Sequence, residues 1–384
     1  MSALFQNYAR RSLHIVKGEG TTVWDDQGKT YLDFTSGIAV VSLGHSHPKM
    51  VSALQTQAEN LWHISNLFES PAQEKLAADL VKDTPLSRAL FCNSGAEANE
   101  AAIKLARKAT GKHVIITFEQ SFHGRTTGAM AATGQDKVKE GFGPLMPEFR
   151  TIPFNNVEAL KAAIDEDTAA VMLEVIQGEG GVNPIDEDFA TELQKLSESA
   201  GFLLIIDEVQ TGIGRTGTRY AFEQTPLKPD IVTLAKGLGG GFPVGAILGT
   251  EALADYFGPG SHGSTYGGNP LAVTAAQTVV DHIFNEAFLE EVRKKAAYLR
   301  EQLASLFGLS QVTCIQGKGL MLGIVLSTEA GPIVKKAEEN GLLLVPAGPN
   351  VIRLLPPLTV SYEECKQAAS LLEKTMMQVE YTVS

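Results

Sequence analysis

Residues 203–208 read LLIIDE and residues 231–236 read IVTLAK, and these two runs decide the fold. Each begins with unbroken apolar residues, which is typical of a strand buried on both faces of a sheet. Asp207 follows the apolar residues of the first run, and Lys236 is the last residue of the second. The sequence GLGGGFP that follows Lys236 contains too much glycine to continue a strand or a helix. The pattern predicts an α/β protein with an acid and an amine at two strand ends.

The chemistry of these two side chains suggests a cofactor. Ligands of open α/β sheets bind beyond the carboxyl ends of the strands, so Asp207 and Lys236 face one crevice if their strands share a sheet. A lysine can form a Schiff base with the aldehyde of pyridoxal phosphate, while an aspartate can keep the ring nitrogen protonated and the ring electron-poor. The pair is the chemical minimum for this cofactor, and neither residue suffices alone.

The composition restricts the class of protein. A chain of 384 residues favours two or three domains, and a hydrophobic content of 44% provides sizeable cores. The net charge of -12 argues against a nucleic-acid partner, which would require a concentrated basic face. No apolar stretch reaches the length of a membrane span. Three scattered cysteines predict neither a disulfide framework nor a zinc site, which suits a reducing cytosol.

The first residues of the chain allow two interpretations. Arg10, Arg11 and Lys17 occur without any acid in the first eighteen residues, which faintly resembles an organelle presequence. The alternation typical of a β-hairpin begins already at Val23, so we expect a mature N-terminus. The sequence GHSHP at residues 44–48 has His-x-His spacing, but no carboxylate cluster or further histidine is near in sequence, which favours a structural turn over a metal site.

A candidate phosphate site follows a short strand. Residues 90–100 read LFCNSGAEANE and predict a strand that leads into an alanine-rich helix. Ser94 and Glu97 have the spacing of a capping box, and Gly95 allows a ligand to approach the backbone closely. The free amides of a helix N-terminus bind anions, although most capping boxes are purely structural.

Two further strand ends carry candidate side chains. The apolar run 114–118 precedes SFHGRT, in which Phe122 could stack on a ring and Arg125 could bind a carboxylate. A core aromatic residue and a surface ion pair are the alternative interpretation. The run 169–174 leads into EVIQGEGG, which contains Glu179.

The sequence lacks a residue that each of three other enzyme classes requires. The run ending in Asp207 could be the Walker B strand of an NTPase, but the one Gly-Lys-Thr triplet, at residues 28–30, has Val23 where the phosphate loop needs glycine. The glycines after Lys236 are weak evidence for a dinucleotide site because no acid follows about twenty residues on at a strand end. Ser261 has Pro259 in place of the first glycine of a hydrolase motif.

The sequences DEVQTGIGRTG at 207–217 and LAKGLGGGFP at 234–243 resemble those of the class III aminotransferases, which are pyridoxal phosphate enzymes of fold type I. Within that class the chain is similar to the acetylornithine aminotransferase subfamily. The resemblance extends from Gly18 to Pro357. One departure is Val175, where most relatives have proline, and this changes local stiffness more than chemistry.

The resemblance implies a role for each candidate residue. Lys236 would bind the cofactor and then move a proton between substrate and cofactor, and Asp207 would hold the ring nitrogen. The other implied cofactor contacts are Gly95 and Ala96 with the phosphate, Phe122 and Val209 with the two ring faces, Gln210 with the ring hydroxyl, and Thr265 with the phosphate of the partner subunit. The implied substrate contacts are Arg125 with the α-carboxylate, Ser264, and a Glu179–Arg353 pair that opens for glutamate.

The resemblance also implies how the domains and the subunits are arranged. We expect a large domain over residues 53–275 with a mostly parallel sheet between helices, and a smaller α+β domain formed by residues 1–52 and 276–384. The threonine contact across subunits implies a homodimer with active sites at its interface. No nucleic-acid, membrane or metal partner is expected.

The implied activity is transamination between N2-acetyl-L-ornithine and 2-oxoglutarate in arginine biosynthesis, in the cytoplasm. Relatives that use free ornithine have a tyrosine where this sequence has Ile38, and an apolar residue there suits an acylated α-amino group. Succinylornithine, ornithine and 4-aminobutyrate remain alternative donors. A non-catalytic pyridoxal-binding sensor is the alternative from another class, and it would normally carry an added DNA-binding segment.

Overall fold

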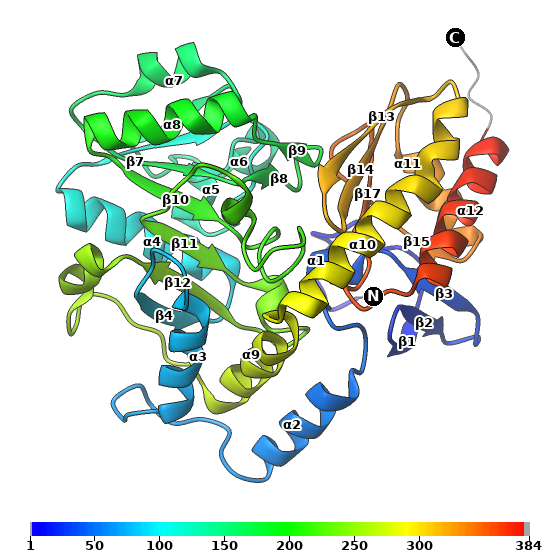
Figure 1. Ribbon diagram of the computed structural model, residues 1–384, viewed down its shortest axis with the longest axis horizontal. Coiled ribbons are helices and arrows are strands. Elements are labelled where there is room, and N and C mark those ends of the chain that lie inside the picture. The colour runs from blue at the N-terminus through cyan, green and yellow to red at the C-terminus, as the bar shows by residue number, and fades with distance from the viewer. Residues whose placement is uncertain (1, 380–384) are drawn as a thin grey trace.

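The computed structural model describes residues 2–379. A seven-stranded sheet forms the larger part of the molecule (Figure 1). Its strands in spatial order are β4 (Arg88–Cys92), β12 (Gly245–Gly249), β11 (Ile231–Leu234), β10 (Leu203–Asp207), β7 (Thr168–Leu173), β5 (Val114–Phe118) and β6 (Phe149–Ile152). All neighbours from β11 to β6 are parallel, whereas β12 runs antiparallel to β11 and β4. This sheet confirms the predicted α/β class.

Strands β10 and β11 are direct neighbours. Ile205 is opposite Ile231 and Asp207 is opposite Thr233, in parallel register. Residues 204–207 and all of β11 are buried, which explains the unbroken apolar runs in both segments. Both strands therefore end at the same edge of the sheet, and this confirms the expectation that Asp207 and Lys236 share a crevice.

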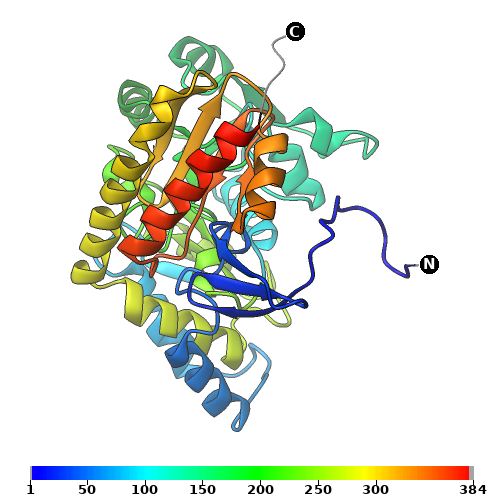
Figure 2. The ribbon, with the colours of Figure 1, turned by 90° about the vertical axis from the view of Figure 1, so that its right-hand side faces the viewer.

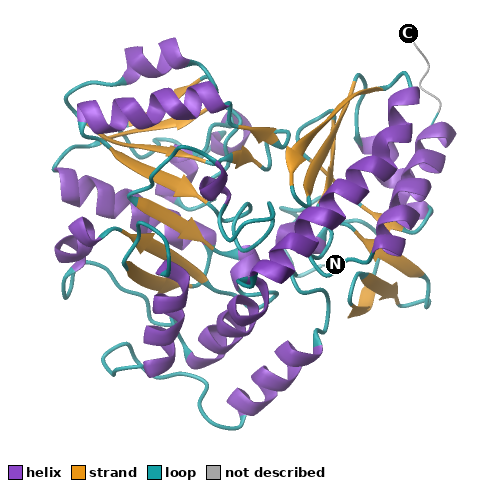
Figure 3. Ribbon diagram, viewed as in Figure 1, coloured by secondary structure: helices purple, strands orange, loops and turns teal. Residues whose placement is uncertain are grey.

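Helices cover both faces of this sheet (Figure 3). On one face, Ala101, Ala102 and Leu105 of α4 (Gly95–Thr110) pack in one cluster with Ile205. On the other face, α8 (Glu187–Ala200) packs in a cluster that contains Leu204 and Ile206. Successive side chains of a strand point to opposite faces, so β10 contributes side chains to the hydrophobic clusters on both faces of the sheet. The small alanines of α4 let that helix lie close to the strands, which brings its N-terminus to the sheet edge beside Asp207.

A second part of the molecule lies beside the large sheet in Figure 1 and faces the viewer in Figure 2. Its antiparallel sheet contains β13 (Val312–Lys318), β14 (Met321–Leu326), β17 (Val351–Leu354) and β16 (Val345–Pro346). The helices α10 (Glu286–Gln302), α11 (Gly331–Glu339) and α12 (Tyr362–Gln378) belong to the same part. A further sheet has the order β1 (Ile15–Glu19), β2 (Thr22–Asp25), β3 (Thr30–Asp33) and β15 (Leu342–Leu343).

The last of these sheets joins the two ends of the chain. β15 pairs in parallel with β3, with Leu342 opposite Leu32 and Leu343 opposite Asp33. The N-terminal and C-terminal segments therefore form one sheet. The domain boundaries at residues 52 and 275 stay a prediction.

The remaining elements connect or flank these sheets. They are α1 (Ser36–Ala39), α2 (Pro48–Ala58), α3 (Pro71–Val81), α5 (Thr127–Ala132), α6 (Asp136–Lys139), α7 (Val157–Ala163), α9 (Pro270–Ile283), β8 (Ile176–Gln177), β9 (Asn183–Pro184), and the 3-10 turns η1 (Ala221–Gln224), η2 (Lys236–Leu238), η3 (Glu251–Phe257) and η4 (Leu303–Gly308).

The antiparallel pairing of β2 with β3 confirms the predicted hairpin. The glycine-rich segment after β11 differs from expectation because it begins with the turn η2.

The part of the chain that the structure describes contains neither a candidate membrane span nor a candidate metal cluster. No helix between residues 2 and 379 is long and apolar enough to cross a membrane. In the same range no group of three or more His, Cys, Asp or Glu side chains could hold a metal ion. His45 contacts Asp33, with 2.8 Å between Nε2 and Oδ2. All three cysteines are free thiols.

Candidate active site

A cavity of about 450 Å³ opens where β10 and β11 end. It has the size of a small-molecule site. Its walls come from segments far apart in sequence, and among the predicted site residues they include Gly95, Ala96, Phe122, Arg125, Glu179, Asp207, Val209, Gln210 and Lys236. The structure therefore brings most of the predicted site residues together.

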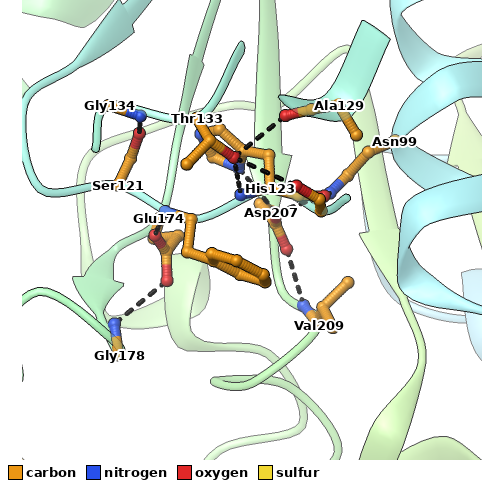
Figure 4. A network of polar contacts seen from close by, with 12 residues as sticks. Asn99, Ser121, His123, Ala129, Thr133, Gly134, Glu174, Gly178, Asp207 and Val209 are labelled. Carbon is orange, nitrogen blue, oxygen red and sulfur yellow. Dashed lines mark hydrogen bonds and ion pairs between the residues drawn. The ribbon is translucent and has the colours of Figure 1, made fainter. Parts of the chain in front are cut away.

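Asp207 lies at the base of this cavity and accepts three hydrogen bonds (Figure 4). Asn99 Nδ2 and His123 Nδ1 lie 2.8 and 2.7 Å from Oδ2, and the Val209 amide lies 3.0 Å from Oδ1. The side chain is only 3% exposed. Three donors from three segments fix the plane of the carboxylate.

Lys236 occupies an unusual backbone conformation. Its φ is +41°, a region that side-chain-bearing residues rarely adopt. The turn η2 holds this conformation through bonds from the Leu238 amide to the Ala235 carbonyl and from the Gly239 amide to the Lys236 carbonyl. Burial lowers the pKa of the Lys236 ammonium below its ordinary value, and the nearby Glu179 opposes the shift. The neutral amine needed for imine formation is therefore more accessible than in an exposed lysine.

The N-terminus of α4 presents unpaired amides to the cavity. Ser94 Oγ accepts a bond from the Glu97 amide at 3.1 Å, as a capping box requires. The second hydrogen bond of a capping box, from the Ser94 amide to the Glu97 carboxylate, is not formed. The Glu97 carboxylate accepts from the Asn93 amide instead. Within residues 2–379 the amides of Gly95 and Ala96 donate no hydrogen bond. These two donors are free for an anion.

Gly95 is required at this helix terminus for a steric reason. A Cβ atom there would lie 2.8 Å from Cγ1 of Val209, closer than such atoms approach in proteins. The missing side chain lets the loop after β10 pass directly beside the helix terminus. The anion site and Asp207 thereby face the same cavity.

Phe122 and Arg125 both line the cavity. The Phe122 ring is half-buried, and the Arg125 guanidinium lies 5.6 Å from its centroid. Arg125 is exposed, and it forms no ion pair with any residue that the structure describes. In the described residues, Phe122 is therefore not a fully buried core residue and Arg125 has no ion-pair partner, while their predicted roles stay predictions.

Glu179 and Arg353 form a two-pronged ion pair at the cavity wall. Nη1 and Nη2 of Arg353 lie 2.7 and 3.1 Å from the two carboxylate oxygens of Glu179. Arg353 is 1% exposed, and Nη1 also donates to the Gly178 carbonyl and to Gln210 Oε1. The charge of Arg353 lowers the pKa of the Glu179 carboxyl, although burial alone would raise it. The pair hides Arg353 from the cavity.

Ser264, Thr265 and Ile38 lie outside the main cavity of this chain. Ser264 Oγ accepts bonds from Asn93 Nδ2 and the Gly267 amide, and it lines a neighbouring hollow with the exposed Thr265. Ile38 is 37% exposed and is not part of the cavity wall, where Val40 stands. A single subunit therefore does not place these three residues in the cavity wall, and their predicted contacts stay predictions.

Sequence reasoning missed three polar residues around Asp207. Asn99 and His123 bind its carboxylate, and Glu174 accepts bonds from the amides of Phe122 and Gly178 at 3.0 Å each. Glu174 thereby ties together the loops that carry Phe122 and Glu179. Burial raises the pKa of Glu174 to about 7, with the charge of Asp207 adding to the shift and His123 opposing it. No local pattern could have revealed these contacts, because the partners are distant in sequence.

Glu208, next to Asp207, points away from the cavity and organises the following loop. It is 1% exposed and binds the Thr211 hydroxyl at 2.5 Å and the Phe222 amide at 2.8 Å. Burial raises the pKa of its carboxyl from 4.5 to about 7, with the hydrogen bonds opposing the shift. The folded protein therefore binds a proton here more tightly than the unfolded chain does.

Glu208→Gln is expected to remove a pH-dependent loss of stability. As pH rises from 4.5 through 7, the native state retains a proton that the unfolded chain has released, so this group lowers stability with rising pH. An amide can keep both hydrogen bonds without a charge, so the variant gains at most about 3 kcal/mol at pH 8 and little at pH 4. Melting temperatures between pH 4 and 8 test this, with the exposed Glu187→Gln as control. A pH-independent difference from the parent protein would contradict the prediction.

The cavity fits pyridoxal phosphate on several independent points. The unpaired amides of Gly95 and Ala96 suit a phosphate, the buried Lys236 amine suits an aldehyde, and the charged Asp207 suits a protonated ring nitrogen. Each of the three cofactor groups thus has a complementary partner in one cavity.

Comparison with known proteins agrees with this fit. The family model for aminotransferase class-III matches residues 5–376. Acetylornithine aminotransferases from Halalkalibacterium halodurans and Listeria innocua are 56% and 55% identical, over 98% of this chain and 99% and 98% of theirs. Ornithine aminotransferase from Toxoplasma gondii superposes with a TM-score of 0.93 at 34% identity, covering 98% of this chain and 92% of that one. N-acetylornithine aminotransferase from Stenotrophomonas maltophilia has a TM-score of 0.85 at 40% identity, covering 96% and 97%.

The fold and the site are those of pyridoxal phosphate enzymes of fold type I. The chain belongs to the class III aminotransferases. It is a transaminase with pyridoxal phosphate as cofactor, and the alternative of a non-catalytic sensor is wrong.

Proposed function

We propose that this enzyme transfers the terminal amino group of N2-acetyl-L-ornithine to 2-oxoglutarate, giving N-acetyl-L-glutamate 5-semialdehyde and L-glutamate in arginine biosynthesis. The observation that carries the proposal is the arrangement of two arginines: Arg125 lines the cavity without an ion-pair partner among the described residues, and Arg353 lies behind Glu179 of the cavity wall. A terminal-amine donor has one carboxylate, far from the reacting carbon, whereas glutamate has a second one beside it. The names of relatives at 52–56% identity support the choice of donor.

Several residues of this chain would hold the cofactor. Lys236 binds its aldehyde, Asp207 its ring nitrogen, and the amides of Gly95 and Ala96 its phosphate. Phe122 and Val209 line the cavity and would cover the two ring faces. Within the described part of the chain, Gln210 Nε2 donates one hydrogen bond, to Glu179 at 3.3 Å, so its second hydrogen is available for the ring hydroxyl. The bound cofactor supplies an electron sink for the carbanion formed at the substrate.

Lys236 also moves the proton. Its Nζ lies in a buried site, where the amine pKa is lowered. With the cofactor bound, an uncharged Lys236 would be the base that takes up and returns the substrate proton. Arg125 orients the substrate through a forked contact with the α-carboxylate.

The Glu179–Arg353 pair is the proposed selector between the two substrates. While the acylated donor is bound, Glu179 neutralises Arg353 and keeps it from attracting a carboxylate. When glutamate binds, the pair opens and Arg353 receives the carboxylate beside the reacting carbon. The bonds of Arg353 to Gly178 and Gln210 keep the guanidinium in place while Glu179 moves.

Glu179→Ala is expected to affect the two half-reactions unequally. Without the carboxylate, Arg353 is a permanent buried cation that binds glutamate but misplaces the acylated donor, so kcat/KM should fall roughly 10- to 100-fold for the donor and only a fewfold for glutamate. Rapid mixing of the holoenzyme with each substrate measures both half-reactions through the absorbance of the bound cofactor. Glu179→Gln, which keeps the shape and loses the charge, is the matched control. Equal losses in both half-reactions would count against the selector.

A homodimer would complete the site, with Thr265 of each subunit at the phosphate held by the other. Two observations support this. Thr265 is exposed and lies outside its own cavity, and the adjoining segment 61–68 exposes Trp62 by 65%, Leu67 by 90% and Phe68 by 61%. Asn66 of this segment donates to the carbonyls of Ser264 and Gly267, so the apolar side chains flank the Thr265 loop. Apolar exposure of this kind marks an interface.

Two further expectations belong to the proposal. Ser264 would contact the substrate that Arg125 binds. The acidic surface and the free thiols suit the cytoplasm.

A scan of amino donors tests the substrate. Purified holoenzyme is mixed with acetylornithine, succinylornithine, ornithine and 4-aminobutyrate, and the rate of change of the bound-cofactor absorbance is measured. We expect the largest kcat/KM with acetylornithine, because Ile38 replaces the tyrosine that would receive a free α-amino group. A preference for ornithine or 4-aminobutyrate would overturn the donor and leave the chemistry intact.

A further inference from the structure

Arg215 is a buried cation that takes no part in the functions assigned so far. It is 2% exposed, and no carboxylate of residues 2–379 forms an ion pair with it. Burial lowers the pKa of the guanidinium to about 9, so the group is still charged at neutral pH. A charge buried without an acidic partner costs stability, and an apolar side chain of similar size would avoid that cost. We therefore expect this residue to have a task that packing alone does not require.

The guanidinium joins two parts of the chain. Arg215 lies in the loop that follows β10, and its Nη1 donates to the carbonyl of Leu320 at 3.0 Å and to that of Pro356 at 2.6 Å. The Leu320 amide in turn donates to the Arg215 carbonyl at 3.0 Å. Leu320 directly precedes β14, and Pro356 follows β17 by two residues. Arg215 thus connects the loop beyond the seven-stranded sheet to two strands of the second part of the molecule.

The two carbonyls belong to opposite strands of one antiparallel pair. β14 and β17 are paired up to Leu322 and Leu354, which lie opposite each other. Two residues further along this register, Leu320 comes opposite Pro356. The guanidinium binds both carbonyls there, and so it bridges the strands just beyond the last pair of their own ladder. Arg353 is only three positions before Pro356 in the same segment.

Two more contacts fix the loop after β10 against this strand pair. Gly319, in the turn before β14, has a φ of +57°, and a Cβ atom there would lie 2.5 Å from the Arg215 carbonyl oxygen. The turn therefore lies directly on the backbone of the loop, an approach that a side chain would prevent. At its other end the loop carries Gln210, whose Oε1 accepts from Arg353 Nη1 at 2.8 Å. The loop thus holds β17 at Arg353 itself and again at Pro356.

We propose that Arg215 is a positioning residue for Arg353: by fixing the open end of the β14–β17 pair to the loop after β10, it sets the place at which Arg353 receives the carboxylate beside the reacting carbon of glutamate. The inference rests on the proposed role of Arg353. Glu179 acts on the guanidinium of Arg353, whereas Arg215 acts on the strand that carries it. The acylated donor does not bind to Arg353, so Arg215 affects glutamate and 2-oxoglutarate selectively.

Half-reaction kinetics of two holoenzyme variants test the selectivity. Arg215→Met keeps the length of the side chain without its donors, and Arg215→Lys keeps a charge with a shorter reach. We expect Arg215→Met to raise KM for glutamate and for 2-oxoglutarate roughly 10-fold, because a displaced binding group weakens its contact, and Arg215→Lys to raise it less. The kcat/KM for acetylornithine should stay within a few fold. Equal losses with both substrates would overturn the proposal.

Arg293 provides the matched control. It belongs to α10, and its Nη1 donates to the Gly217 carbonyl of the same loop at 2.7 Å, without contact to β14 or β17. Arg293→Met therefore removes a similar bond between the loop and the second part of the molecule. It should leave the ratio of the glutamate and acetylornithine rates unchanged. A shift of that ratio as large as in Arg215→Met would show that any loosening of the loop suffices, and the proposal would fail.

A further variant leaves the guanidinium intact, so the test does not depend on the folding of Arg215→Met. Gly319→Ala pushes the turn before β14 away from the Arg215 carbonyl, and it should raise KM for glutamate with the same selectivity. An unchanged KM for glutamate in this variant would contradict the proposal.

A double-mutant cycle separates this inference from the role of Arg353. Arg353→Ala should weaken glutamate far more than acetylornithine, and adding Arg215→Met to it should change the glutamate rate by less than about twofold. If Arg353→Ala slows both half-reactions equally, the proposed role of Arg353 fails. If Arg353→Ala is selective but Arg215→Met is not, or if the two effects simply add, the positioning role of Arg215 alone is overturned.

Discussion

Lys236→Ala is expected to lower kcat about 10⁴-fold or more, because the covalent attachment of the cofactor and the group that moves the proton are lost together. The other binding groups remain, so the variant should still bind pyridoxal phosphate, but its spectrum should be that of the free aldehyde. Single-turnover assays with glutamate measure the loss, and absorbance spectra report the state of the cofactor.

The matched control for Lys236→Ala is the addition of small primary amines. An amine that diffuses into the space left by the side chain can replace the base, so methylamine should restore part of the rate in the variant and none in the parent enzyme. Lys236→Arg keeps a positive charge but cannot form the imine, and it should be as inactive as the alanine variant. Turnover by Lys236→Ala at the speed of the parent would refute the role of this residue.

Asp207→Ala is expected to lower kcat about 10³-fold, the second largest effect. The carboxylate is the charged group that would keep the ring nitrogen protonated, and its loss leaves the donors Asn99 Nδ2 and His123 Nδ1 facing a space without an acceptor. Asp207→Asn keeps the size and an acceptor but not the charge, so it should be nearly as slow while unfolding at a higher temperature than Asp207→Ala. Kinetics and thermal melts of the two holoenzymes measure both effects.

A modified cofactor serves as the control for Asp207. Pyridoxal phosphate methylated at the ring nitrogen has a permanent positive charge and does not depend on an acid for it. Reconstitution with this analogue should recover much of the rate in Asp207→Ala, whereas it should slow the parent enzyme, in which the methyl group collides with the carboxylate. No recovery in the variant would show that Asp207 has a different task.

The sequence predicted the central part of the fold because burial on both faces leaves a clear pattern. β10 and β11 are unbroken apolar runs, and α4 begins where Ser94 caps it. The strand β13 was missed, since its sequence VTCIQGK mixes polar and apolar residues and only its pairing with β14 makes it a strand. The turn η2 was missed for a related reason. Its positive φ at Lys236 depends on surrounding packing that no local propensity encodes.

The site was predictable where its residues follow strand ends in recognisable motifs. Asp207 and Lys236 followed from chemistry and topology, while Phe122, Arg125 and Arg353 followed from the resemblance. The contact of His123, in the sequence SFHGRT, with Asp207 could not be predicted, because the two residues are 84 positions apart. Pairing at such distances is decided by the folded sheet, and a single sequence does not contain it.

The pairing of β15 with β3 has a consequence for the order of folding during synthesis. Leu32, near the start of the chain, has its strand partner at Leu342. A ribosome must therefore translate almost the whole polypeptide before the sheet that begins at Ile15 can be completed. The seven-stranded sheet needs nothing beyond Gly249 and can assemble earlier on the nascent chain. Until β15 has been made, β3 has an open edge that could pair with another chain.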